Sequence, residues 1–260
     1  MVTCLRDTTS TMRSVVVCMC AWVLTATPAA AQSQSARAEM PSVRSLFTDL
    51  GQDVAHLRTW GTVETLAVGG GIAAALKHED ARLTRHVAGA RDAEEILDPG
   101  EVIGEGTLQA AGALATYVVA RVTHNVRGAV LGAGLFRAQV LSGGITQGLK
   151  YAIRRERPDH GRNSFPSGHA SAAFATATVI ERTFGWKAGV AAYATAAYVG
   201  VSRLSENKHF ASDVAFGAAI GILGGRAVML GHGKTRLDVS PFVSRSTRDV
   251  GVTVAIRSVD

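Results

Sequence analysis

Apolar segments rich in alanine and glycine recur along most of this chain, and they restrict it to a helical fold. Helices are expected over 42–60, 62–77, 105–123, 127–155, 169–184, 186–202 and 208–230. Alanine favours helix and adds little side-chain volume, so these helices should be slim and closely packed. With 47% apolar residues in 260, a substantial core is possible. We therefore predict an all-α protein, a bundle of about six to eight helices.

The character of the chain changes after Gly233. Residues 237–243 and 250–256 alternate apolar with small or polar residues, and 244–249 suits the turn between them. This pattern predicts a short C-terminal β-hairpin. The expected organisation is a signal peptide at 1–31, a lead-in and amphipathic helix at 32–60, the helical domain at 61–233 and the hairpin tail at 234–260.

The N-terminal segment has the three parts of a secretory signal. Arg6 and Arg13 precede an apolar run at 15–24, and alanines lead up to Gln32. We expect cleavage after Ala31 and export to the periplasm, with translation starting at Met1 or Met12. The cysteines all lie inside this segment: Cys4, Cys18 and Cys20. The mature chain would therefore contain no disulfide.

Whether the helices cross a membrane is left open by the sequence. Each charge-free run is shorter than the roughly 18 residues that argue for a membrane span, which favours a soluble or peripherally attached bundle. Gly217, Gly221 and Gly225, however, form a small-residue ladder typical of membrane helices. The alternative location is the inner membrane with the active site facing the periplasm. The basic residues are scattered without interleaved aromatics, so no nucleic-acid partner is expected.

The first cluster of chemical interest is Lys150 followed, after six residues, by Arg157 and Pro158. Seven residues are close to two helical turns, so both cations should project from one face of a helix that Pro158 ends. The other arginines nearby suit a solvated helix end: Arg154, Arg155 and Arg162.

The second cluster runs from Ser164 to His169 and opens an alanine-rich helix. A start at Ser167 and Gly168 leaves backbone N–H groups unpaired and pointing outward, which makes an anion site. His169 would then lie beside the bound anion. The simpler interpretation is a helix cap made by Ser167 and a surface histidine.

The third cluster is Ser202 and Arg203, then His209 and Asp213. On a helix, residues four apart are neighbours, so Asp213 could accept a hydrogen bond from His209 Nδ1 and leave Nε2 free to attack. Arg203 offers a guanidinium fork suited to phosphate oxygens. Together the three clusters contain what phosphoryl transfer requires, with Lys150, Arg157 and Arg203 in place of a metal.

The motifs resemble the type 2 phosphatidic acid phosphatase family, which shares its core with bacterial acid phosphatases and vanadium haloperoxidases. The family pattern is Lys, six residues, Arg-Pro, then Pro-Ser-Gly-His, then Ser-Arg, five residues, His, three residues, Asp. The chain matches it at Lys150, Arg157, Pro158, Pro166, Ser167, Gly168, His169, Ser202, Arg203, His209 and Asp213.

This resemblance implies a metal-independent phosphatase that forms a phosphohistidine. By the same resemblance His209 is the nucleophile, Asp213 its partner and His169 the general acid. The phosphate-binding residues would be Lys150, Arg157, Ser167, Gly168 and Arg203. No cofactor and no metal are implied.

Several alternatives remain open from the motifs. A vanadium-dependent haloperoxidase would place vanadate in the same pocket, and a non-catalytic helical binding protein could retain it. The substrate of a phosphatase could be a lipid phosphate, with membrane association, or a soluble ester. The sequence does not set the oligomeric state.

Overall fold

The computed structural model describes residues 40–88, 94–228, 235–243 and 250–258. The predicted signal peptide, the residues that follow it up to 39 and the predicted turn at 244–249 lie outside this described part. The chain divides into two compact units, one formed by the helices and one that contains both strands.

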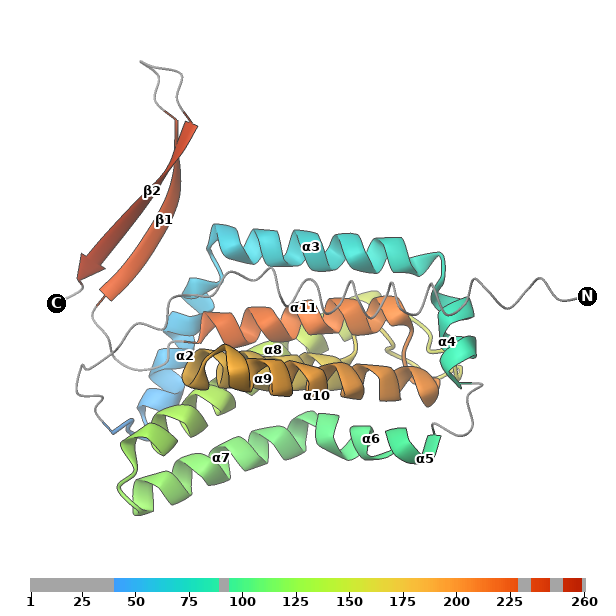
Figure 1. Cartoon of the computed structure of the whole chain (residues 1–260), viewed down its shortest axis with the longest axis horizontal. Helices are drawn as coiled ribbons and strands as arrows, with labels where there is room; N and C mark the ends of the chain where they lie inside the picture. Colours follow the sequence, from blue (N-terminus) through green and yellow to red (C-terminus); the bar gives the residue numbers. More distant parts are fainter. Residues whose placement is uncertain (1–39, 89–93, 229–234, 244–249, 259–260) are drawn as a thin grey trace, which may run out of the picture. The chain divides into compact units, whose positions relative to one another are not determined.

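The helical unit contains every helix that the sequence predicts, with shorter ends at several of them (Figure 1). The helices are α2 (Ser45–His56), α3 (Trp60–Lys77), α4 (Asp80–Ala88), α5 (Glu94–Leu97), α6 (Pro99–Gly104), α7 (Gly106–Val122), α8 (Val126–Ile153), α9 (Gly168–Phe184), α10 (Trp186–Ser205) and α11 (Ala211–Ala227). The short helices α4, α5 and α6 lie between residues 80 and 104, a part of the chain for which no helix was predicted. The all-α class is confirmed for this unit.

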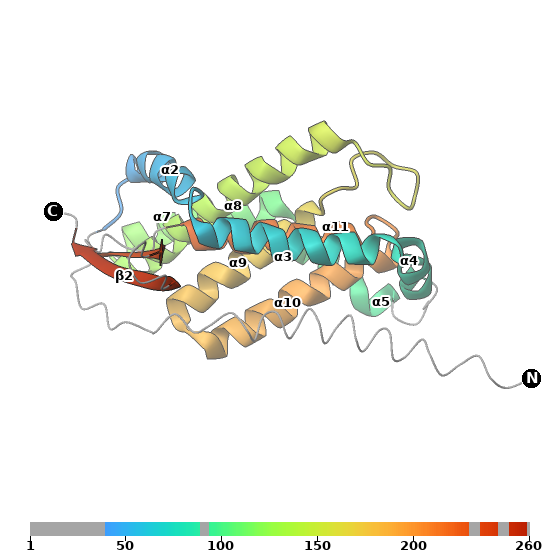
Figure 2. The same cartoon turned by 90° about the horizontal axis from the view of Figure 1, so that it is seen from above.

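Helix α9 is the centre of the packing and contacts α8, α10 and α11 (Figures 1 and 2). Helix α3 covers α11, and α7 pairs with α8. One core cluster joins three of these helices: Phe174 of α9 packs with Val199 of α10 and Ile222 of α11, and alanines fill the space between them. Small side chains let the helix axes approach closely, as the composition predicts.

Glycines bring α11 into backbone contact with α9. A Cβ at Gly221 would lie 2.3 Å from the carbonyl oxygen of Ser171, and one at Gly217 would lie 2.5 Å from that of Ser167. No real Cβ tolerates such distances, so the glycines are required where the helices cross. The ladder that suggested membrane helices therefore packs α11 against α9 inside the bundle.

The strand unit consists of β1 (Thr235–Val243) and β2 (Val250–Ser258), paired antiparallel. Thr235 lies opposite Ser258, and Val243 lies opposite Val250. These strands cover the two segments in which the sequence alternates.

Among the described residues, only α8 is long and apolar enough to cross a membrane, and half of its most apolar window is buried in the bundle. The core helix of a soluble protein meets the same criterion. Helix length therefore does not decide between the two locations that the sequence leaves open.

We expect Gly221→Ala to destabilise the helical unit by about 1–3 kcal/mol, because the new methyl group would press on the backbone of α9. The matched control is Gly144→Ala in the middle of α8, where a Cβ meets nothing within 4 Å. That change should be neutral or stabilise by up to about 1 kcal/mol, since alanine favours helix. Thermal unfolding of the two variants measures the contrast, and equal unfolding temperatures would contradict the proposed close approach.

Candidate active site

All three sequence clusters meet at one end of the helical unit. There α8 and α10 end while α9 and α11 begin, so residues far apart in the chain converge (Figure 1). Contacts join the clusters: the Ser167 amide donates to the carbonyl of Asp213 at 3.0 Å, and a Cβ at Gly168 would lie 3.9 Å from Cε of Lys150. The structure thus brings together every residue that the motifs single out.

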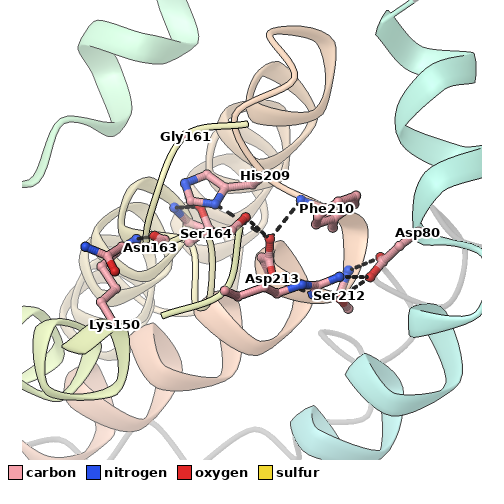
Figure 3. A network of polar contacts seen from close by, with 12 residues as sticks. Asp80, Lys150, Gly161, Asn163, Ser164, His209, Phe210, Ser212 and Asp213 are labelled. Carbon is pink, nitrogen blue, oxygen red and sulfur yellow. Dashed lines mark hydrogen bonds and ion pairs between the residues drawn. The ribbon is translucent and has the colours of Figure 1, made fainter. Parts of the chain in front are cut away.

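Lys150 and Arg157 reach the site from different kinds of backbone. Helix α8 ends at Ile153 because Arg154 adopts a left-handed conformation with φ of 50°. Lys150 therefore lies in the last turn of α8, whereas Arg157 lies in the following loop, and the prediction of a shared helix face is wrong. Lys150 Nζ donates a hydrogen bond to the carbonyl of Asn163 at 2.6 Å (Figure 3). Burial, followed by the charge of Arg157, lowers the pKa of Lys150 to about 8.

The start of α9 fits both interpretations of the second cluster, the helix cap at Ser167 and the anion site. Ser167 caps the helix by accepting from the amide of Ala170 at 3.4 Å, and its own amide donates to the carbonyl of Asp213 at 3.0 Å. A Cβ at Gly168 would lie 3.9 Å from Cε of Lys150, so the lysine passes close to this helix start. The first-turn N–H groups and the ammonium group therefore border the same space.

Arg203 is held rigidly in the last turn of α10, with 2% of its surface exposed. Its guanidinium group forms an ion pair with Glu206, and its Nε donates to Ser202 Oγ at 3.3 Å. A buried, oriented guanidinium group is a strong site for phosphate oxygens.

His209 and Asp213 are arranged differently from the prediction. Helix α11 begins at Ala211, so His209 precedes the capping residue Phe210 and does not lie on the helix. The distance from His209 Nδ1 to Asp213 Oδ2 is 3.8 Å, which is too long for a direct hydrogen bond. Asp213 Oδ2 instead accepts from the Phe210 amide at 2.9 Å and from the Ser164 hydroxyl (Figure 3).

Arg155 supports the other oxygen of this carboxylate, so its assignment to a solvated face is wrong. Its Nη1 donates to Asp213 Oδ1 at 2.7 Å, and its Nη2 donates to Asp80 Oδ2 at 2.8 Å. Asp80, at the start of α4, also accepts from the amide of Ser212 at 2.9 Å (Figure 3). The Arg155 guanidinium group lies 4.3 Å from the ring centre of Phe210. One arginine thus joins two buried aspartates across the chain.

These contacts determine the protonation of the pair. Burial alone would raise the pKa of Asp213, but the hydrogen bonds it receives and the charge of Arg155 lower it, so the carboxylate stays ionised. For His209, burial lowers the pKa, and the cations Lys150 and Arg157 lower it further, although Asp213 acts in the opposite direction. The imidazole is therefore neutral at neutral pH, the state in which a ring nitrogen carries a lone pair.

His169 has a carboxylate of its own. Its Nε2 lies 3.7 Å from Oε2 of Glu105, in the connection between α6 and α7. Burial, followed by the charge of Arg203, lowers the pKa of His169 to about 4, although Glu105 acts in the opposite direction. The site therefore contains two histidines, each with a carboxylate just beyond hydrogen-bond distance.

Three buried nitrogen atoms at the site have no hydrogen-bond partner within the described part of the chain: Arg157 Nε, His169 Nε2 and His209 Nδ1. His209 Nδ1 faces Asp213 and His169 Nε2 faces Glu105, each just beyond hydrogen-bond distance, so Arg157 Nε is the one of the three that is left for a bound ligand. The described residues contain no group of three or more His, Cys, Asp and Glu side chains that could hold a metal ion.

The sequence missed four residues that complete the site: Asp80, Glu105, Ser164 and Arg155. Ser164 and Arg155 lie inside the recognised clusters, and their positions next to Pro166 and Arg157 were an available signal. Asp80 and Glu105 lie far upstream in segments with no motif, so no sequence signal pointed to them.

Comparison with known proteins agrees with this geometry. Residues 128–236, which include all three clusters, match the model of the PAP2 superfamily. The match covers less than half of the chain, so it shows a similarity to this superfamily around the site. Among solved structures, the transmembrane PAP2 type phosphatidylglycerolphosphate phosphatase from Bacillus subtilis covers 70% of this chain, with 92% of its own length, 19% identity and a TM-score of 0.50. At that identity the likeness supports the PAP2 fold alone.

Two PAP2-like relatives share more sequence. A lipid A 1-phosphatase of Porphyromonas gingivalis is 46% identical over 89 residues, which are 33% of this chain and 20% of that protein. A decaprenylphosphoryl-5-phosphoribose phosphatase of Mycobacterium tuberculosis is 35% identical over 118 residues, 41% of this chain and 63% of that protein. The chain thus spans less than two thirds of the length of these relatives.

We expect Arg155→Ala to destabilise the protein by about 3 kcal/mol, because it leaves two buried carboxylates without their cation. Arg162→Ala removes an exposed arginine of the same loop and serves as the control. Denaturant unfolding measures both variants. The bridging role of Arg155 is refuted if the two variants are equally stable.

Proposed function

We propose that this chain is a metal-independent phosphatase that hydrolyses phosphate monoesters of lipids through a phosphohistidine at His209. The observation that carries the proposal is the convergence of Lys150, Arg157 and Arg203 with the start of α9 around a buried, neutral histidine. Three cations and the free backbone donors stabilise the negative charge that spreads over the phosphate oxygens in the transition state.

The proposed reaction has two steps. First, His209 Nε2 attacks phosphorus with its lone pair while the bond from phosphorus to the ester oxygen breaks, and His169 gives that oxygen a proton. Then water attacks the phosphohistidine, His169 takes a proton from the water, and the bond from phosphorus to nitrogen breaks to release phosphate. Asp213 stabilises the charge that develops on the His209 ring.

His169 needs the substrate to become an acid. Its pKa of about 4 means that it is neutral in the empty site at neutral pH. A phosphate dianion in the pocket would raise this pKa, because a negative charge nearby favours the imidazolium form. Substrate binding and protonation of His169 are therefore coupled.

Exposed apolar residues beside the site support a lipid substrate. Helix α6 packs against the site, since a Cβ at Gly104 would lie 3.1 Å from His169. The outer surface of α6 exposes Val102 and Ile103, and the end of α8 next to Lys150 exposes Tyr151 (68%) and Ile153. Such a surface suits acyl or prenyl chains better than water. The names of both relatives above, which denote phosphatases of lipid A and of a decaprenyl phosphate compound, point the same way.

We further propose that the protein is exported and works at the membrane, with the site on the periplasmic side. The signal-like N-terminal segment and the apolar surface beside the site support this location. Whether the bundle rests on the bilayer or is inserted in it is tested by extraction: high-salt or alkaline washing would release an attached protein, whereas an inserted one would require detergent.

Two histidine variants test the mechanism. We expect His209→Ala to abolish hydrolysis of every phosphomonoester, because it removes the nucleophile. We expect His169→Ala to reduce hydrolysis of an alkyl phosphate by about 10²–10⁴-fold, the range that general acid catalysis supplies, and to affect 4-nitrophenyl phosphate far less. Nitrophenolate leaves without a proton, whereas an alkoxide does not. Equal losses on both esters would contradict an acid role for His169.

Chelation and vanadate test the class of chemistry. Because arginine and lysine provide the positive charge, we expect EDTA to leave the activity unchanged and micromolar vanadate to inhibit it as a mimic of the transition state. A strict requirement for a divalent ion would contradict the mechanism. Bromination with vanadate, peroxide and bromide, in the absence of phosphatase activity, would instead identify a haloperoxidase.

A further inference from the structure

Among the described residues, Glu105 is the one carboxylate within 4 Å of a His169 ring nitrogen. The charged and titratable groups around His169 are Arg203 from α10, His209 from the connection before α11, Lys150 from α8 and Glu105. Burial, the two cations and the second histidine disfavour a proton on His169, and Glu105 is the largest influence that favours it. An acid in this position needs such a counter-charge.

The structure holds Glu105 in place with its two oxygens in separate roles. Oε1 caps α7, accepting from the amide of Thr107 at 3.1 Å and from its hydroxyl at 2.7 Å. Oε2 is left to face His169 Nε2 at 3.7 Å. The bonds from Thr107 lower the pKa of Glu105 below its ordinary value, so the carboxylate is ionised at neutral pH.

The connection between α6 and α7, which carries Glu105, is held to the core by polar contacts. Gln109 Nε2 donates to the carbonyl of Ile103 at 2.7 Å, which fixes the end of α6. Gln109 Oε1 accepts from Gln139 of α8 at 3.0 Å and from Thr176 of α9 at 2.6 Å. This network ties the start of α7 to the helix that begins beside His169, so the spacing between the carboxylate and the imidazole is set by the core.

Glycines of α6 let the same connection pack closely against the end of the bundle that contains the proposed site. A Cβ at Gly100 would lie 2.3 Å from Ser202 Oγ, and one at Gly104 would lie 2.4 Å from Val199 Cγ1 and 3.1 Å from His169 Cδ2. Side chains at these two positions would push α6 away and carry Glu105 with it. The close approach is what brings the carboxylate within reach of the ring.

We propose that Glu105 is a positioning residue for the proton transfer of the proposed phosphatase reaction, holding the ring of His169 and stabilising its imidazolium form through Oε2. A carboxylate at this distance acts on the whole ring, whichever nitrogen faces the substrate. The role rests on the proposed function, and it pairs each catalytic histidine with a separate carboxylate.

The decisive variant is Glu105→Gln, which keeps the Oε1 acceptor for the cap and removes the charge from Oε2. We expect kcat/KM for an alkyl phosphate to fall roughly ten- to a hundredfold, with no more than about a threefold change for 4-nitrophenyl phosphate. Without the carboxylate, His169 loses its proton at lower pH. The limb of the pH profile at which alkyl phosphate hydrolysis is lost on raising the pH should therefore move to lower pH.

Two controls separate this role from a structural one. Thr107→Ala removes the hydroxyl bond to Oε1 and weakens the cap while leaving the carboxylate charged. Glu101→Gln removes another charge from α6, one that acts on Arg203 and is not among the largest influences on His169. Both controls should keep the wild-type ratio of alkyl to nitrophenyl activity. If either reproduces the change in Glu105→Gln, the role is structural and the proposal is wrong.

A readout independent of activity is the titration of the His169 imidazole by NMR in the full-length protein, assigned through His169→Asn. Its midpoint should lie at lower pH in Glu105→Gln than in the wild type, and an unchanged midpoint would overturn the proposal. If the wild type hydrolyses neither ester, the proposed function fails and this role fails with it. If it hydrolyses both and Glu105→Gln keeps the wild-type ratio, only the role of Glu105 is wrong.

Discussion

The buried carboxylate of Asp213 is the interaction on which the rest of the site depends. It is completely shielded from solvent, and a charge there would be costly without partners. Its oxygens receive bonds from Ser164, from Arg155 and from the amide of Phe210, while its backbone carbonyl receives the amide of Ser167. One residue therefore connects the loop after α8, the start of α9 and the start of α11, so satisfying this single charge assembles the site.

The two histidines have contrasting surroundings, and the contrast suits two tasks. His209 is 3% exposed and is kept neutral by burial, as a nucleophile requires. His169 is less enclosed and lies among cations, with Glu105 as the opposing charge. Groups whose environments push their protonation apart are typical of a site that uses one as a base or nucleophile and the other as an acid.

Close helix packing and the proposed catalysis are linked in this fold. The glycine at 217 lies against the carbonyl of Ser167, directly at the start of α9 that would hold the phosphate. Gly104 lies close to the side chain of His169, which is 3.1 Å from a Cβ placed at this glycine. Because the small residues place helix ends within a few ångströms of one another, the precision of the site depends on the core as much as on the charged residues.

The sequence by itself determined the helical class, the approximate helix positions and the residues of the three clusters, because helix periodicity and motif spacing are local properties of the chain. It was wrong about the helix face of Arg157, about a direct hydrogen bond between His209 and Asp213, and about the solvated position of Arg155. In each case a helix was shorter than the pattern indicated: α8 ends before Arg154, and α11 begins only at Ala211. Only the tertiary structure decided that Arg155 bridges Asp80 and Asp213, and that Glu105 faces His169. Those partners lie between 58 and 75 residues apart in the chain, and their pairing depends on the path of the backbone through the core, which no local pattern encodes.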